Sequence, residues 1–162
     1  MATVIVLCQA GLLALMAAWL TVALRDNLRH PEINEQFAHE VLSLSRIERD
    51  FPALFGILAR RRITSPRTQK ATFGLIVVVE GIVALLLWAG AAALVLAAAG
   101  LIASEPARAL GLVGAFGFVS LWAGFVIAGN YFCYWLCHEG AQNTHFQLLI
   151  WGLGSMILLA LA

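Results

Sequence analysis

The sequence predicts an all-α protein, a bundle of four membrane-spanning helices with a long polar loop between the first two spans. Of the 162 residues, 62% are hydrophobic and only 12% are charged, whereas soluble domains are about 45–50% apolar and about 25% charged. Charge is also segregated, because nine of the ten Lys and Arg residues lie between Arg25 and Lys70. No soluble core could bury this much apolar surface, so the class of soluble globular proteins is excluded.

Four apolar stretches are long enough to cross a bilayer, whose core of about 30 Å needs roughly 20 residues of helix. We place the spans at residues 3–24, 71–100, 107–136 and 146–162, within a single membrane domain of residues 1–162. The first is too long and begins too abruptly for a secretory signal, so we expect it to be retained. The second exceeds the bilayer thickness, so it must tilt, protrude or end early, with Gly100 as a candidate end.

The polar loop, residues 25–70, is expected to carry short amphipathic helices. One apolar face at helical spacing comprises Ile33, Phe37, Val41, Leu44 and Ile47. Pro31 is placed to start that helix, and Ser65 with Pro66 has the pattern that starts the second span. A second short piece, residues 54–58, precedes three arginines. Two interpretations stay open: these pieces lie on the membrane surface among anionic headgroups, or they fold against the bundle.

The distribution of basic residues predicts the orientation, because Lys and Arg near span ends mark the cytoplasmic side. Seven flank the loop: Arg25, Arg29, Arg60, Arg61, Arg62, Arg67 and Lys70. We therefore expect the loop and the connection at 137–145 to face the cytoplasm, and both termini to face the periplasm. The expected location is the inner membrane of a bacterium, with membrane lipids as partners.

Glu80 is the one acidic residue placed deep within a predicted span. An acidic side chain there costs about 2.5–3.5 kcal/mol on insertion scales, so it should face the bundle interior and find a polar partner. Depth favours Ser120, Trp122 or Ser155 as that partner. Two roles stay open for Glu80: a structural link between helices, or proton or cation handling.

Cys133, Cys137 and His138 are residue types that bind soft metals, and on a helix the two cysteines would share a face. Their spacing has one residue too many for covalent haem attachment, and a structural zinc site needs four ligands in tetrahedral geometry. We therefore expect no cofactor here. The residues are interpreted as interfacial, beside an aromatic belt of Tyr131, Tyr134 and Trp135.

Small residues line one side of the third span, at Gly117, Ser120, Gly124 and Ala128. Such residues let helices approach closely, so we expect this face to pack against another span of the same chain. A contact with another molecule is the secondary alternative.

An ordered pattern of residues runs along nearly the whole chain. It comprises Asn27, Pro31, Asn34, Phe37, Ile63, Ser65, Pro66, Glu80, Gly129, Phe132 and Trp135. In order and spacing this pattern resembles the bacterial family of predicted small integral membrane proteins, domain of unknown function 2165. The resemblance implies four spans but offers no established activity. Relatives carry their basic residues elsewhere, which implies the opposite orientation, and the Cys133–Cys137 pair is not part of the family pattern.

No phosphate-binding glycine loop, catalytic triad spacing or zinc-protease motif occurs in the sequence. We therefore expect a non-enzymatic accessory or scaffold subunit of a larger inner-membrane assembly. Its expected partners are other membrane subunits or further copies of itself, and no nucleic acid. One alternative is a small transporter or proton-handling protein that uses Glu80, and a lesser one is a redox or metal protein that uses the segment 133–138.

Overall fold

The computed structural model describes residues 1–161, and this part of the chain is all-helical with no strand. The described residues contain seven α-helices and two short 3₁₀ helices. In chain order they are α1 (Ala2–Arg29), α2 (Pro31–Ser43), α3 (Ser45–Asp50), α4 (Pro52–Leu58), η1 (Ala59–Arg61), α5 (Pro66–Ala98), α6 (Ser104–Tyr131), η2 (Tyr134–Leu136) and α7 (Glu139–Ala160).

Three of these helices, α1, α5 and α6, are long and apolar enough to cross a membrane. The fourth expected span corresponds to α7, whose 22 residues measure about 33 Å. Its first turns are polar, with Glu139, Gln142, Asn143 and His145, so α7 lacks a continuous apolar stretch as long as those of the other three. The structure therefore supports a multi-pass membrane protein with three spans, and the fourth span stays a prediction.

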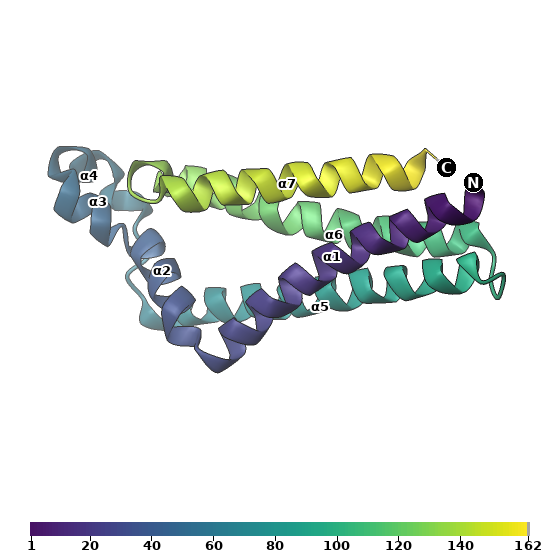
Figure 1. The fold of residues 1–162 in the computed structure, drawn as a ribbon. Helices are drawn as coiled ribbons and strands as arrows, with labels where there is room; N and C mark the ends of the chain where they lie inside the picture. The colour runs from purple at the N-terminus through teal and green to yellow at the C-terminus, as the bar shows by residue number, and fades with distance from the viewer. Residues whose placement is uncertain (162) are drawn as a thin grey trace.

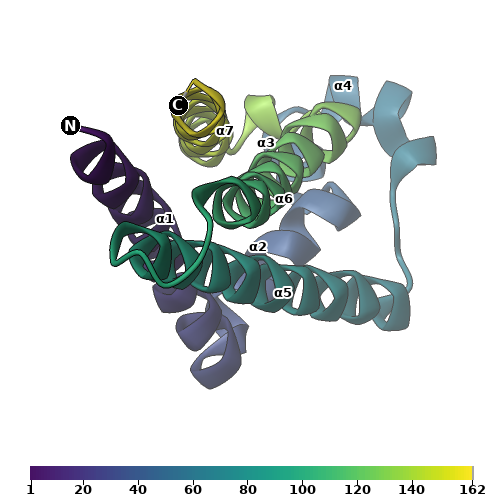
Figure 2. The same cartoon turned by 90° about the vertical axis from the view of Figure 1, so that its right-hand side faces the viewer.

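The long helices pack in the order α1, α5, α6 and α7, each mainly against the next. Both termini lie at one end of the molecule, and α2 to α4 lie at the other end beside the connection between α6 and α7 (Figure 1). Viewed from the end, α6 lies between α5 and α7, and α5 runs obliquely across the bundle (Figure 2). Because its 33 residues measure about 50 Å, α5 must tilt or protrude, as expected.

Local signals in the sequence explain where α5 begins and ends. The Ser65 hydroxyl accepts a hydrogen bond of 3.4 Å from the Thr68 amide, and Pro66 occupies the first turn. After Ala98 the chain turns through Gly100, whose φ of +74° is a conformation that glycine adopts readily. Both expected boundaries are confirmed.

The third span ends earlier than predicted. We expected it to continue to residue 136, but α6 stops at Tyr131 and Cys133 adopts a φ of +54°. That left-handed residue turns the chain into η2, which leads to α7.

The polar loop folds into a compact unit, which we call the loop platform: α2, α3, α4 and η1, residues 31–61. Its buried Leu42, Leu44 and Ile47 share an apolar cluster with Phe132 and Cys133 at the end of α6. The platform therefore folds against the end of the bundle, which was one of the two interpretations.

The expected continuous apolar face of the loop is interrupted. Leu44 adopts a φ of +55°, which separates α2 from α3. As a result, Ile33 and Phe37 are 60% and 49% exposed, whereas Leu44 and Ile47 are buried.

Candidate functional site

Glu80 lies at the buried end of a chain of three polar side chains that joins α5, α1 and α2. The Asn27 amide donates a buried hydrogen bond of 2.7 Å to Glu80 Oε2. Asn34 in turn donates a bond of 2.6 Å to Asn27 Oδ1. Because Glu80 is only 4% exposed and Asn34 is exposed, the chain runs from the surface of the loop platform to a buried carboxyl group.

The expected partners of Glu80 were wrong. Ser155 donates to the Trp151 carbonyl at 3.0 Å, Ser120 is exposed, and the Trp122 indole nitrogen is buried with no hydrogen-bond partner among the described residues. Depth within the predicted spans and antiparallel neighbours were the basis for expecting these partners. In the structure Glu80, near the middle of α5, instead meets Asn27, close to the C-terminal end of α1.

Trp122 belongs to an aromatic stack rather than to the Glu80 chain. Its ring lies 5.3 Å from Trp19 of α1 in an edge-on arrangement, and 5.3 Å from His145 of α7 in a stacked one. His145 also stacks on Phe125 and faces Tyr134, whose hydroxyl is 3.4 Å from His145 Nδ1. The stack joins three of the long helices, and no pattern in the sequence indicates it.

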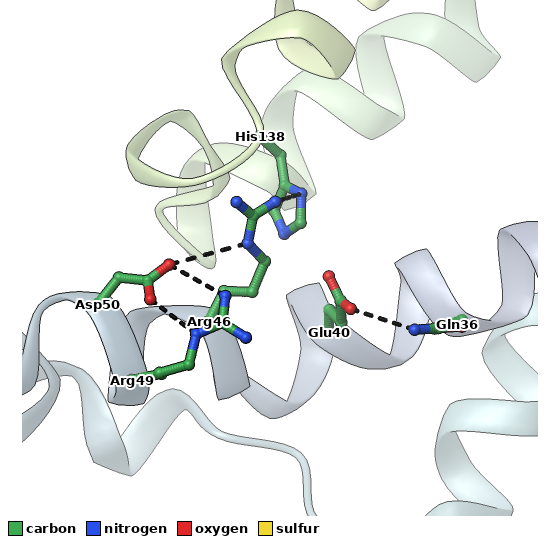
Figure 3. A network of polar contacts seen from close by, with 6 residues as sticks. All are labelled: Gln36, Glu40, Arg46, Arg49, Asp50 and His138. Atoms are coloured by element: carbon green, nitrogen blue, oxygen red, sulfur yellow. Dashed lines mark hydrogen bonds and ion pairs between the residues drawn. The ribbon is translucent and has the colours of Figure 1, made fainter.

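The loop platform is held to the rest of the protein by a second polar cluster (Figure 3). Arg46 of α3 points its Nη1 at His138 Nδ1 across 3.4 Å, and its Nε lies 4.0 Å from Asp50 Oδ2. Asp50 also accepts two bonds from Arg49, at 2.7 and 3.2 Å. The ring of Phe37, from α2, lies 5.4 Å from the His138 ring.

A cleft of about 590 Å³ opens beside this cluster. Arg46 and His138 line it together with Phe37, Phe51 and the first residues of α7. Burial lowers the pKa of His138, and the nearby Arg46 cation lowers it further, whereas Glu40 opposes the shift. His138 therefore favours its neutral form. Arg46 was not a candidate from the sequence, since 92 positions separate it from His138.

A second anchor for the platform lies at η1. Arg61 donates a bond of 2.7 Å to the Tyr131 carbonyl and lies over the Tyr131 ring at 5.2 Å. The same guanidinium reaches Cys133 Sγ at 3.6 Å. The bond to Tyr131 uses a carbonyl group that the end of α6 leaves without an intrahelical partner.

Cys133 and Cys137 do not share a face of one helix, because α6 ends before them and η2 separates them. That expectation was wrong. Among residues 1–161, no group of three or more His, Cys, Asp or Glu side chains is placed to hold a metal ion. Burial raises the pKa of Cys137, so its thiol stays protonated near neutral pH.

The predicted small-residue face of α6 was largely wrong. Gly117 contacts Val83 of α5, but Ser120, Gly124 and Ala128 are exposed, and a Cβ on Gly124 would meet nothing within 4 Å. The close contacts between α6 and α5 lie instead in the N-terminal half of α6. A Cβ on Gly114 would meet the backbone of Leu87 at 3.0 Å, and one on Gly90 would meet Gly111 Cα at 2.8 Å.

The residues of the sequence pattern gather at the loop end of the protein. Asn27, Asn34 and Glu80 form the hydrogen-bonded chain described above, and Ile63 donates its backbone amide to the Leu42 carbonyl at 2.9 Å. Gly129 has no room for a side chain, because a Cβ there would overlap the ring of Tyr134. Trp135 is 44% exposed. Several residues of the pattern therefore form contacts where the loop platform meets the long helices.

Comparison with protein families identifies a family that covers almost the whole chain. The family described as "Predicted small integral membrane protein (DUF2165)" matches residues 5–162, and this confirms the resemblance inferred from the pattern. Neither the curated proteins nor the solved structures contain a significant match to the chain.

Proposed function

Since the chain belongs to the family of predicted small integral membrane proteins, we propose that it is a non-enzymatic accessory or scaffold subunit of a larger assembly in a bacterial inner membrane. In this proposal α7 is the fourth span, and the loop platform lies on the cytoplasmic side. The surrounding partners are membrane lipids and other membrane subunits.

The observation that supports this role best is the position of Glu80. Its carboxyl group is hydrogen-bonded to Asn27, and through Asn27 to the platform. Neither of the two clefts at the loop end, of about 590 and 360 Å³, is lined by Glu80. A buried acid that joins helices and lines neither of these clefts suits a structural link better than an ion pathway.

The test is purification of the tagged protein in a mild detergent, followed by determination of the mass and composition of the complex. We expect a foreign membrane protein in fixed stoichiometry. Two glycines in open space, Gly11 on α1 and Gly124 on α6, provide a matched pair of leucine variants. Loss of the partner in only one of them would locate the contact, whereas a monomer or homo-oligomer alone would contradict the accessory role.

One observation favours a second function, proton handling through Glu80. Asn34 is exposed and Asn27 connects it to the buried carboxyl group, so a polar route leads from water to Glu80. Proteoliposomes with a pH-sensitive dye inside test this function. Proton flux that is lost in Glu80→Gln would support it, and flux equal to that of empty liposomes would exclude it.

A further inference from the structure

His138, just before α7, contacts two helices of the loop platform, α2 and α3. The residue is 6% exposed, and its backbone amide donates to the Tyr134 carbonyl at 2.6 Å. Phe37 of α2 packs against the imidazole, and Arg46 of α3 approaches Nδ1 at 3.4 Å (Figure 3). The ring is therefore one of the contacts that position the platform, together with the Arg61 anchor and the apolar cluster around Leu44.

The geometry requires a neutral imidazole. A guanidinium group has only hydrogen-bond donors, so Nδ1 of His138 must accept and its proton must be on Nε2. Protonation would remove this acceptor and place two cations 3.4 Å apart. His138 also precedes the first residue of α7, where the helix dipole disfavours positive charge.

The charged groups around His138 do not cancel this effect. On α3, Asp50 is engaged with both Arg46 and Arg49. On α2, Glu40 favours a protonated His138, but it contributes less than burial and Arg46, which act in the opposite direction. Cys137 and Glu139 flank His138 in sequence. The cleft beside the ring opens to the loop side, so protons from water can reach it.

We propose that the contact between Arg46 and His138 is a pH-sensitive latch, which holds the loop platform at neutral pH and releases it when His138 is protonated. The docked state favours the neutral ring, so the stabilisation is present above the pKa of a free histidine, about 6.5, and is lost as the pH falls below it. The inference adds regulation to the proposed accessory role, because release would change the surface offered to a partner.

Hydrogen–deuterium exchange of the full protein in lipid nanodiscs tests the latch. Protection of amides in α2 and α3 is measured at pH 7.5 and pH 5.0, relative to amides of α6 as an internal reference for the intrinsic pH dependence. We expect roughly a tenfold loss of relative protection at pH 5.0. In His138→Asn, an amide oxygen can replace Nδ1 as acceptor and cannot titrate, so the protection should be the same at both pH values.

His39→Asn is the matched control, because His39 also lies on the platform and its Nδ1 is 2.7 Å from Gln69 Oε1. This variant should keep the wild-type pH response. An unchanged wild type at pH 5.0, a response that survives in His138→Asn, or one that disappears in His39→Asn would overturn the latch.

Arg46→Gln provides a second route if His138→Asn does not fold. Without the cation next to His138, the loss of protection at pH 5.0 should be clearly smaller, and an undiminished loss would contradict the proposal. Exchange reports platform docking whether or not a partner exists. Failure of the accessory role in the purification experiment is therefore distinguishable from failure of the latch.

Discussion

Asn27, two residues before the end of α1, donates a hydrogen bond of 2.7 Å to Glu80 of α5. This bond places the buried carboxyl group where the polar loop joins the spans, away from Trp122 and Ser155. Glu80 therefore links α1 and α5 as a hydrogen-bond acceptor. This role can be tested separately from the charge of the carboxyl group.

Replacement of Glu80 by leucine should destabilise the protein, whereas replacement by glutamine should not. Glutamine keeps an oxygen that can accept from Asn27, but leucine leaves the buried Asn27 amide without a partner, at a cost of about 1–3 kcal/mol. Thermal unfolding in detergent measures the difference. Glu105→Leu is the control, because Glu105 is exposed at the start of α6. Equal melting temperatures for wild type and Glu80→Leu would refute the structural role.

Leucine at Gly114 should destabilise the protein by about 1–3 kcal/mol, because its side chain would collide with the backbone of Leu86 and Leu87. Leucine at Gly124 should leave the unfolding free energy within about 0.5 kcal/mol of wild type, since nothing lies within 4 Å. Both variants belong to the same helix, so the comparison isolates packing. A Gly124→Leu protein that melts as early as Gly114→Leu would show that this face does pack internally.

The sequence was sufficient for features that depend on local chemistry. The Ser65–Pro66 start of α5, the Pro31 start of α2 and the turn at Gly100 follow from preferences of single residues, and these three helix boundaries appear where expected. Features that depend on how helices lie against one another were not predictable. The partner of Glu80 and the packing face of α6 depend on the relative level and rotation of helices, which apolar composition does not encode because lipid-facing and core-facing residues are equally apolar.

The same distinction applies to the candidate site. The sequence pattern contained Asn27, Asn34 and Glu80 without indicating that they bond to one another, because 53 positions separate Asn27 from Glu80. The left-handed residues Leu44 and Cys133 were also missed, since neither is a residue type that favours that conformation. Tertiary packing of both side chains in the apolar cluster at the loop end accompanies these turns.

Truncation of Leu44 to alanine should loosen the loop platform while the long helices stay folded. Leu44 is 1% exposed in the cluster that joins the platform to the end of α6, and loss of a buried leucine side chain costs about 2–5 kcal/mol. Limited proteolysis should then cut within residues 31–61 faster than in wild type. Leu54→Ala is the control, because Leu54 is 41% exposed. Unchanged proteolysis of Leu44→Ala would indicate that the polar anchors alone hold the platform.

The orientation of the protein in the membrane can be tested with two engineered cysteines. Ala53 on α4 and Ala103 between α5 and α6 are both exposed. Helix α4 and the connection between α5 and α6 lie at opposite ends of the molecule (Figure 1). Seven basic residues near the span ends at the loop side oppose its translocation, so we expect the loop platform in the cytoplasm. In intact cells, an impermeant thiol reagent should therefore label Ala103→Cys and leave Ala53→Cys unlabelled until the membrane is permeabilised.

The background for this experiment must lack Cys8, Cys133 and Cys137, and each engineered protein must first show wild-type melting, because Cys133 is buried in the platform cluster. Labelling of Ala53→Cys alone would reverse the orientation and favour the arrangement that the family resemblance implies. That result would also place the Arg46–His138 latch in the periplasm, where the pH follows the medium. The expected result places it in the cytoplasm, where the latch would respond only to acidification inside the cell.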